Sequence, residues 1–303
     1  MTHTVGIIGL GNMGGAISTN LVKSGFTVAG FDINSYMIAR AKDNGVETKF
    51  GIAEVAKAAD IIILSLPNPA ALHAVTTEFA EVGDKDTILV ETGTLTIEDK
   101  EAARDRLAAA GITLLDCPLS GTGHQARTGD LVVFTSGDEE VVNKCLPMFA
   151  GFSRSQKYCG EFGNGIRMKF VANHLIAVHN TATAEAMVLG MKSNLDQNLV
   201  YDVVSESSGT SRMFEIRGKL MADSNWDDVS ATNLLFKKDL DVITNYAADI
   251  GCPVPLFSLA AQPFRAAMSR GLEQRDTASV CLLLEEAAGI DRDNWPPEAN
   301  KKK

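Results

Sequence analysis

Lys169 and Asn173 are the residues of this chain whose types and spacing best fit proton transfer. They lie four residues apart in a segment with a helical pattern, so their side chains share one helix face. Ile166, Phe170 and Ile176 make the surroundings of that face apolar. A lysine desolvated there can lose pKa and act as a general acid or base, with the asparagine orienting the lysine or its substrate. A lysine on a helix is usually just solvated, so the pair alone leaves both interpretations open.

A glycine-rich turn near the start of the chain predicts a nucleotide site. It follows an apolar strand, 5–8, and precedes a helical segment, 16–23. The turn consists of Gly9, Leu10, Gly11, Asn12, Met13 and Gly14. Its first glycine permits the tight turn, the second lets backbone approach a pyrophosphate, and the third lets the helix pack closely on the sheet. The phosphates would lie on N–H groups at the helix N-terminus. An ordinary glycine turn in a parallel sheet is the alternative.

Asp32 indicates which dinucleotide is bound. It follows a second strand, 26–31, and lies 21 residues after Gly11, where a carboxylate can accept hydrogen bonds from the ribose hydroxyls. The same carboxylate would repel the 2′-phosphate of NADP, and no basic residue follows before Arg40. We therefore predict that the cofactor is NAD.

A second glycine- and hydroxyl-rich stretch, 116–131, leaves the carboxyl end of a strand, where open α/β sheets bind their ligands. The backbone N–H groups of Ser120, Gly121 and Thr122 could form an anion-binding nest, and the Ser120 hydroxyl could add a donor. A surface turn explains this stretch, taken alone, about as well.

The elements that must position these residues fall into two parts. Alternating short strands and helical patterns over the first 115 residues predict right-handed βαβ crossovers and a doubly wound, mostly parallel sheet. Beyond the strands already named, we expect strands at 61–66, 87–90, 112–115 and 131–136 and helices at 97–110 and 139–149.

After Gly163 the strand signals stop. Residues 165–192 are expected to form one long helix, roughly 40 Å from end to end. Later helices are expected at 199–206, 234–248, 256–268 and 277–288. We thus predict an α/β Rossmann domain at 1–163, a long interdomain helix at 164–192, and an all-α domain for substrate binding and oligomerisation at 193–303.

Composition limits the partners. The 303 residues, 45% hydrophobic and 22% charged, are typical of a globular protein of about two domains. A formal net charge of −10 argues against nucleic acid and anionic membranes, and no apolar run approaches the 18 or so residues of a membrane span. Five scattered cysteines without zinc spacing predict reduced thiols, a cytoplasmic location and no metal site. No signal segment is expected before the first strand.

In order and spacing, these motifs resemble those of the β-hydroxyacid dehydrogenase family, which includes 3-hydroxyisobutyrate dehydrogenase, tartronate semialdehyde reductase and threonate dehydrogenase. Residues 9–14 resemble the family's cofactor loop, 116–121 its substrate-binding signature, and 163–173 its catalytic signature. Further similarities are Pro67, Thr94, Glu185-Ala186 and Lys238-Asp239-Leu240. The resemblance covers nearly the whole chain.

The resemblance implies a reversible hydride transfer between NAD and a small 3-hydroxy acid, or its semialdehyde or keto form. It implies that Lys169 is the general acid/base, that Asn173 holds the substrate, and that Asp239 is structural. Substrate binding would involve Ser120, Gly121, Thr122, Lys238, Ser211, Arg212 and Phe214. Cofactor binding would involve Gly9, Leu10, Gly11, Asn12, Met13, Gly14, Asp32, Leu66, Pro67, Thr94 and Lys238.

Departures from the family pattern leave the substrate open. Thr122 replaces a common glycine, and His124 or Gln125 could contact a polar substrate. Glu91-Thr-Gly93-Thr94 replaces the usual Asp-x-Ser-Thr. Arg212 stands where an aromatic residue is common, and it could equally be a solvated surface residue.

Two other functions compete with this interpretation. An imine reductase shares the expected architecture but typically lacks the lysine, so Lys169 argues against it. A non-catalytic nicotinamide-binding module would have no need for the Lys169–Asn173 pair. A homodimer or homotetramer is expected, because the helices of the second domain and the long helix form one-sided layers that need burial.

Overall fold

The computed structural model describes residues 4–292 and 295. The chain divides into two compact units, Met1–Val171 (unit 1) and Ala172–Lys303 (unit 2). The boundary falls inside the long helix α8 (Asn164–Lys192), which is continuous over 29 residues. The expectation of one long helix from 165 to 192 is therefore confirmed.

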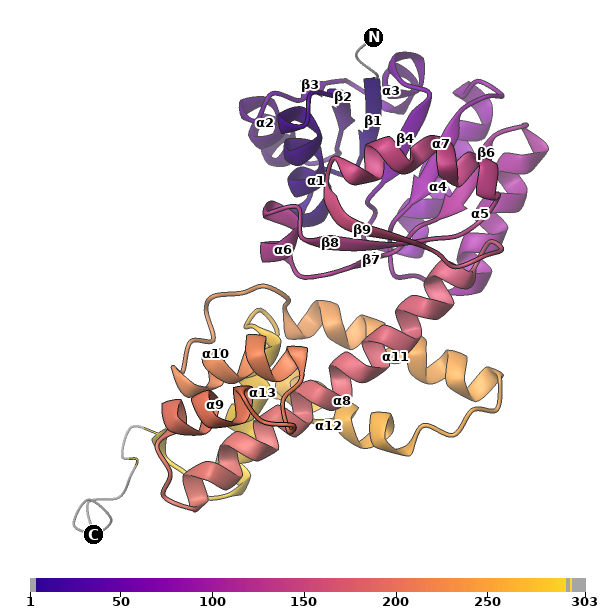
Figure 1. Ribbon diagram of the computed structural model, residues 1–303. Helices are drawn as coiled ribbons and strands as arrows, with labels where there is room; N and C mark the ends of the chain where they lie inside the picture. Colours follow the sequence, from indigo (N-terminus) through magenta and orange to yellow (C-terminus); the bar gives the residue numbers. More distant parts are fainter. Residues whose placement is uncertain (1–3, 293–294, 296–303) are drawn as a thin grey trace. The chain divides into compact units, whose positions relative to one another are not determined.

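Six parallel strands form the main sheet of unit 1, in the order β3-β2-β1-β4-β5-β6 (Figure 1). The strands are β1 (Thr4–Ile8), β2 (Thr27–Phe31), β3 (Glu47–Thr48), β4 (Ile61–Leu64), β5 (Ile88–Glu91) and β6 (Thr113–Asp116). The order reverses between β1 and β4, which is the switch point where sheets of this kind bind ligands. The doubly wound Rossmann sheet is thus confirmed.

Helices cover both faces of this sheet. The helices of unit 1 before α8 are α1 (Asn12–Lys23), α2 (Ser35–Asp43), α3 (Ile52–Ala58), α4 (Pro69–Val82), α5 (Ile97–Ala109), α6 (Gly123–Arg127) and α7 (Glu139–Ala150). Because successive strand residues point to opposite faces, Ile7 packs with residues of α1 and α7 while Ile8 packs with residues of α3, α4 and α5. Each face therefore has its own apolar core, as expected for near-continuous apolar strands.

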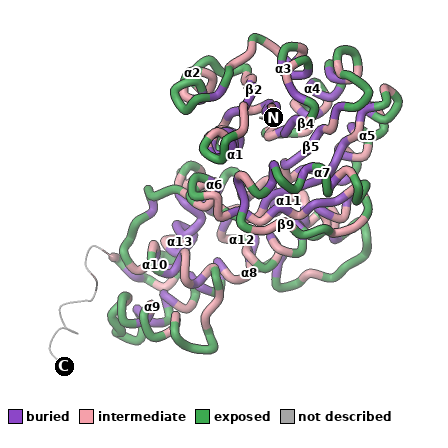
Figure 2. The backbone as a smooth tube through the Cα atoms, turned by 45° about the horizontal axis from the view of Figure 1, so that its top comes forward, coloured by how far each residue is buried: buried purple, intermediate pink, exposed green. Residues whose placement is uncertain are grey.

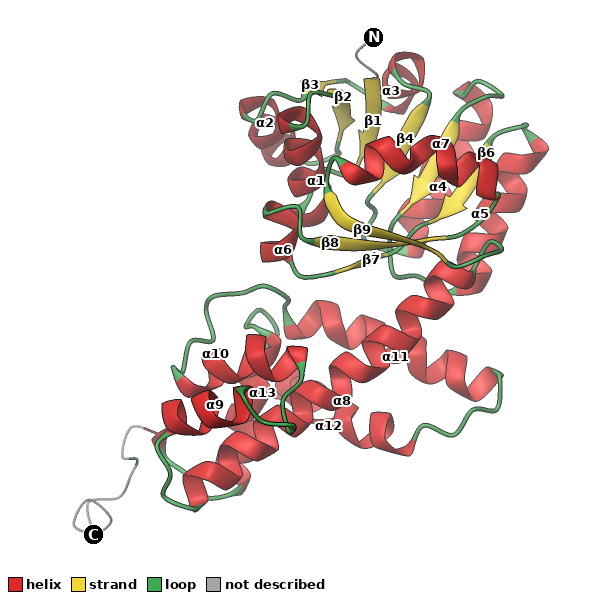
Figure 3. Cartoon of the chain, in the orientation of Figure 1, coloured by secondary structure: helices red, strands yellow, loops and turns green. Residues whose placement is uncertain are grey.

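The region after β6 differs from the sequence-based expectation. The strand expected at 131–136 is present as β8 (Leu131–Thr135), but it lies in a separate sheet of order β7-β8-β9 (Figure 3). There β7 (Leu119–Ser120) runs antiparallel to β8 and β9 (Ser153–Tyr158) runs parallel to it. The sequence did not reveal these two strands because β7 has two residues and β9 is mostly polar, without clean alternation.

In its described part, unit 2 consists of helices and the loops that join them, with one isolated bridge between Thr232 and Asp276 and no strand. Besides its part of α8, it contains α9 (Gln197–Ser205), the π-helical turn η1 (Phe214–Gly218), α10 (Lys219–Ala222), α11 (Asn233–Asp249), α12 (Pro255–Ser269), the 3₁₀ turn η2 (Thr277–Ser279) and α13 (Val280–Ala287). Met187, Leu240, Phe257 and Phe264 are fully buried in it, and Figure 2 marks the buried stretches. The expected all-α region is confirmed.

None of the described helices combines the length and the apolar character needed to cross a membrane.

Candidate active site

The glycine-rich turn lies at the switch point of the sheet, between the ends of β1 and β4. A Cβ at Gly9, where φ is +91°, would lie 2.2 Å from the carbonyl oxygen of Ser65, and a Cβ at Gly14 would lie 1.9 Å from that of Gly9. Protein packing therefore accounts for both of these glycines. A Cβ at Gly11 would meet no atom within 4 Å. The open space beside Gly11 fits the role of a glycine that lets a pyrophosphate approach.

Asp32 is tied to this turn by hydrogen bonds that its sequence position does not reveal. Its Oδ2 accepts a hydrogen bond from the Leu10 backbone N–H at 2.6 Å, and its Oδ1 accepts one from Asn34 N–H at 2.8 Å. The side chain of Arg40 donates to the carbonyl oxygens of Leu10 and Gly11 at 3.3 and 3.1 Å. The fold thus places the basic side chain of Arg40 at the glycine turn, although no sequence motif linked Arg40 to that turn.

The other predicted cofactor residues follow neighbouring strands at the same edge of the sheet. Leu66 and Pro67 come directly after β4, and Thr94 comes shortly after β5. The Asn68 side chain accepts a hydrogen bond from Ala71 N–H at 2.9 Å and so begins α4 directly after Pro67. The carboxyl ends of β1, β4 and β5 therefore present three of the predicted cofactor segments together.

The stretch 116–131 is more ordered than a surface turn. Thr122 begins the short helix α6 through a capping box, in which its N–H donates to Gln125 Oε1 at 3.0 Å and its Oγ1 accepts from Gln125 N–H at 3.3 Å. The Gln125 side chain also donates to Asp130 Oδ2 at 2.9 Å. In this structure the N–H of Thr122 is thus engaged within the protein, and Gln125 serves as a capping residue. Gly121 has φ of +142°, which favours glycine.

Lys169 lies in the second turn of α8 and is only 8% exposed. Its neighbours on this part of the helix, Ile166 and Phe170, are 0% and 3% exposed. A Cβ at Gly165 would lie 2.6 Å from the carbonyl oxygen of Asp116 and 2.7 Å from that of Phe134, so glycine lets the helix start close to the end of β6. The apolar, buried surroundings expected for Lys169 are present.

Asn173 is held by Asp239 of α11. The Asn173 side-chain amide donates to Asp239 Oδ2 at 3.0 Å, and these side chains belong to residues that are 2% and 8% exposed. Lys238 Nζ lies 3.1 Å from Asp239 Oδ1. Asn173 Oδ1 is buried and has no hydrogen-bond partner among the described residues. The Asp239 contact fixes the Asn173 side chain and leaves a buried acceptor oxygen.

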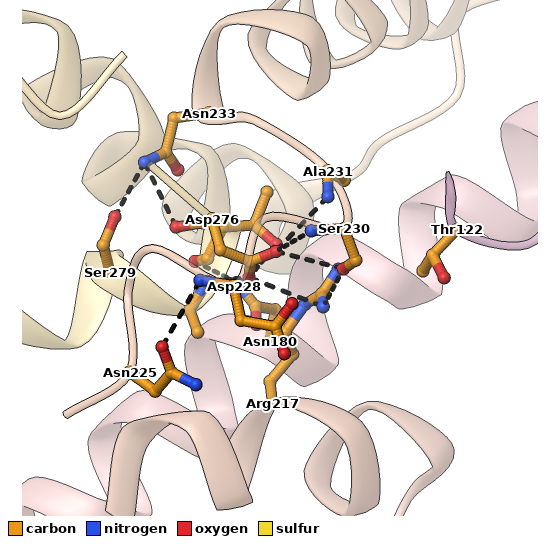
Figure 4. A network of polar contacts seen from close by, with 12 residues as sticks. Thr122, Asn180, Arg217, Asn225, Asp228, Ser230, Ala231, Asn233, Asp276 and Ser279 are labelled. Atoms are coloured by element: carbon orange, nitrogen blue, oxygen red, sulfur yellow. Dashed lines mark hydrogen bonds and ion pairs between the residues drawn. The ribbon is translucent and has the colours of Figure 1, made fainter. Parts of the chain in front are cut away.

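A buried polar cluster lies at the start of α11 (Figure 4). It was not foreseen from the sequence. Asp276 accepts hydrogen bonds from the Ser230 N–H and hydroxyl at 2.9 and 3.0 Å. Arg217 donates to the Ser230 hydroxyl at 2.6 Å and lies 3.4 Å from Asp276 Oδ1. Asn233 donates to Ser279 at 2.8 Å. The cluster thereby fixes the start of the helix that carries Lys238 and Asp239.

The remaining predicted substrate residues lie around η1. Ser211 accepts a hydrogen bond from Phe214 N–H at 3.1 Å, and the buried Phe214 ring stacks on Tyr201. The Arg212 side chain is 69% exposed and forms an ion pair with Glu215 at 2.9 Å. These contacts favour the solvated alternative for Arg212 within unit 2. Among the residues that the structure describes, no group of three or more His, Cys, Asp or Glu side chains could hold a metal ion.

Comparisons with known proteins agree with the Rossmann fold. Residues 4–160 match the family model described as the NAD binding domain of 6-phosphogluconate dehydrogenase, and residues 163–284 match that described as the NAD-binding domain of NADP-dependent 3-hydroxyisobutyrate dehydrogenase. The chain is 30% identical to L-threonate dehydrogenase of Pectobacterium atrosepticum, over 93% of this chain and 94% of the relative. It is also 30% identical to mitochondrial 3-hydroxyisobutyrate dehydrogenase of Mus musculus, over 93% and 87%.

Among solved structures, the chain resembles Mycobacterium tuberculosis 3-hydroxyisobutyrate dehydrogenase with L-serine, at a TM-score of 0.85 and 27% identity, over 94% of this chain and 99% of that one. The fold and the glycine turn define an NAD(P)-binding oxidoreductase. The chain belongs to the β-hydroxyacid dehydrogenase family, and its relatives identify it as a 3-hydroxyacid dehydrogenase acting on a CH–OH group.

Proposed function

We propose that this protein transfers hydride between NAD and a small 3-hydroxy acid, or its semialdehyde or keto form, with Lys169 as the general acid/base. The observation that supports this most directly is the burial of Lys169 one helical turn before Asn173, whose amide Asp239 holds in place. The names of the relatives, which include threonate and 3-hydroxyisobutyrate dehydrogenases, support a small polar hydroxy acid as the substrate.

In the proposed reaction, Lys169 accepts the proton of the substrate hydroxyl during oxidation and returns it during reduction. The nicotinamide, when bound, supplies the hydride acceptor or donor. The unpartnered Asn173 Oδ1 would accept a hydrogen bond from the substrate hydroxyl or from Lys169, which orients the proton that moves. Fixed geometry of this kind lowers the entropic part of the barrier.

Ser120 and Gly121, with Thr122, are proposed to bind the substrate carboxylate. Because the Thr122 N–H is engaged by Gln125, the hydroxyl of Ser120 and the backbone of Gly121 are the better donors in this arrangement. Lys238, Ser211 and Phe214 are proposed to border the substrate, whereas the exposed Arg212 is assigned the solvated alternative. Lys238 is assigned to the substrate because its Nζ lies beside Asp239, the residue that holds Asn173.

The preference for NAD over NADP rests on Asp32. Its carboxylate lies against the glycine turn, where a ribose 2′-hydroxyl could donate to it and a 2′-phosphate would meet its negative charge. The proposed cofactor contacts are Gly9, Leu10, Gly11, Asn12, Met13, Gly14, Asp32, Leu66, Pro67, Thr94 and Lys238.

We also propose a homodimer or homotetramer built through the region 193–303 and the interdomain helix at 164–192. Val171, Leu175 and Leu189 of α8 are 59%, 49% and 69% exposed. Their spacing puts them within about 40° of one another around the helix, with the exposed Ala182 between Leu175 and Leu189, so they lie on one side of α8 that a second copy could cover. Light scattering should give a dimer or larger for the parent and a smaller species for Leu189→Glu. A monomeric parent would contradict this proposal.

The five free cysteines support a cytoplasmic location.

The decisive experiment measures nicotinamide reduction with NAD and NADP against 3-hydroxyisobutyrate, L-serine, glycerate, threonate and related acids. Turnover of one acid is expected with NAD, and Lys169→Ala should lower kcat by about 10²- to 10⁴-fold while NADH still binds. Lys57→Ala, at an exposed lysine of α3, is the matched control. Full activity of Lys169→Ala would overturn the assigned role. An inactive parent that binds NADH would leave the non-catalytic module as the better description.

A further inference from the structure

Lys100 is a lysine that the proposed reaction does not use, yet it is completely buried. It projects from α5, and its Nζ lies 2.5 Å from Glu91 Oε2 and 2.6 Å from Asp116 Oδ1. Glu91 ends β5, Asp116 ends β6, and the two are paired in register across the sheet. We propose that Lys100 is a positioning residue that holds the cofactor turn at 91–94 and the start of α8 in the geometry required for catalysis. This inference rests on the proposed function.

Lys100, Glu91 and Asp116 form a buried charged triad. In it, Glu91 shapes the turn that carries Thr94. Glu91 Oε2 contacts Lys100, while its Oε1 accepts a hydrogen bond from the Gly93 N–H at 2.7 Å. A Cβ at Gly93 would lie 2.7 Å from that same oxygen, so the close approach favours glycine. The Lys100 ammonium therefore fixes the Glu91 carboxylate. That carboxylate fixes the backbone at Gly93, directly before the predicted cofactor residue Thr94.

The Asp116 side of the triad fixes the first turn of α8. Asp116 Oδ2 accepts a hydrogen bond from the Ile166 N–H at 2.8 Å and lies 3.1 Å from Ser136 Oγ, which accepts one from the Gly165 N–H at 2.9 Å. Two of the N–H groups left unpaired at a helix start are thus satisfied, and the helix dipole favours the negative charge of Asp116. Lys169 lies three residues beyond Ile166, so a shift of this turn would move Lys169 with it.

The charges of the triad explain why Lys100 is needed. Burial raises the pKa of the Glu91 carboxyl, and Lys100 acts in the opposite direction. Burial disfavours the charged form of Lys100, but Asp116 and Glu91 outweigh burial and raise the pKa of its ammonium group. Without that ammonium, the two buried carboxyl groups would have no counter-charge, and a rise in pH would favour the ionisation of both and hence their mutual repulsion.

The two thiols near Asp116 do not supply a counter-charge. Burial and the charge of Asp116 raise the pKa of the Cys117 and Cys159 thiols, which favours their neutral forms. The replacement of Lys100 therefore predicts a new dependence on pH that comes from the unneutralised Glu91–Asp116 pair.

The test compares Lys100→Met with the parent by kcat, by KM and by NADH affinity from nicotinamide fluorescence, between pH 6 and pH 8.5. At pH 6 the variant should be within about three-fold of the parent, and at pH 8.5 its kcat should be about 10- to 100-fold lower and its NADH binding weaker. Thermal melts at each pH restrict the comparison to folded protein. A merely structural lysine would lower stability without imposing this pH dependence on kcat.

The double variant Glu91→Gln, Lys100→Met provides the matched rescue. A glutamine amide can donate to Asp116 and still accept from the Gly93 N–H, so this variant should regain the parent's pH profile. Lys57→Met should leave the profile unchanged. Parent-like kcat and NADH affinity of Lys100→Met at every pH, or a folded double variant without rescue, would overturn the proposal. If the parent turns over no acid, the proposed function fails, and NADH affinity alone then decides the role of Lys100.

Discussion

The side-chain amide of Asn173 donates to Asp239 Oδ2 at 3.0 Å, across 66 residues of sequence and with both residues buried. An amide that is free to rotate could present either its oxygen or its nitrogen to a ligand. This hydrogen bond directs the nitrogen toward Asp239 and leaves Asn173 Oδ1 as the acceptor. The orientation proposed for the reacting hydroxyl therefore depends on a residue from another helix.

Asp239→Leu should lower kcat/KM by about 10- to 100-fold, because the Asn173 amide would lose its partner and its orientation. Asp239→Asn keeps an oxygen that can accept from Asn173, and it should retain more activity. The NADH dissociation constant should change by less than about three-fold in both variants. Steady-state kinetics and nicotinamide fluorescence measure these quantities. Unchanged kcat/KM in Asp239→Leu would show that Asn173 needs no such support.

Alanine at two glycines of the cofactor turn should separate stability from binding. Gly14→Ala places a methyl group 1.9 Å from the Gly9 carbonyl oxygen, so the free energy of unfolding should fall by several kcal/mol, about 3 or more. Gly11→Ala meets no protein atom within 4 Å, and Gly11 has a negative φ of −62°. Its melting temperature should match the parent's while NADH binding weakens at least about ten-fold. Calorimetry and nicotinamide fluorescence measure the two effects. Tight NADH binding by Gly11→Ala would place the pyrophosphate elsewhere.

Replacement of Asp32 should weaken NAD use without producing an efficient NADP enzyme. Asp32→Ala removes the acceptor for a ribose hydroxyl and also the acceptors for the Leu10 and Asn34 N–H groups, so the glycine turn loses support. We expect kcat/KM with NAD to fall about 10- to 100-fold, and kcat/KM with NADP to stay below the parent's value with NAD. Asp43→Ala, at the exposed end of α2, is the control. An Asp32→Ala enzyme as fast with NADP as the parent is with NAD would mean that Asp32 acts by charge alone.

Loss of the Asp276 carboxylate, which is buried in the polar cluster at the start of α11, should destabilise the protein strongly. Burial lowers the pKa of the Arg217 guanidinium and Asp276 acts against that effect, so Asp276→Asn leaves a buried charge without its counter-ion. The free energy of unfolding should fall by about 3–5 kcal/mol. Asp223→Asn, in an exposed ion pair with Lys219, should cost less than about 1 kcal/mol. Denaturant titrations of both variants provide the comparison, and equal costs would contradict the structural role of the cluster.

Local sequence patterns predicted most of the fold. The strand–turn–helix signal at 5–23, the apolar strands of the main sheet and the long helical pattern at 165–192 each depend on residues close together in the chain, and the structure confirms them. Short or polar elements escaped prediction because their periodicity is too weak to read, as with β7 and β9, or because glycine and hydroxyl residues suggested a loop, as with α6.

The sequence by itself determined the family, through the order and spacing of its motifs, and it determined the turn that carries Gly9, Gly11 and Gly14 and the helix that carries Lys169 and Asn173, since both follow from local geometry. Only the tertiary structure decided how those residues are supported. It placed Arg40 on the glycine turn, Asp239 on Asn173, and Lys100 between Glu91 and Asp116. Buried polar and charged groups must find partners wherever the fold brings them, so these pairings depend on three-dimensional packing rather than on distance along the chain.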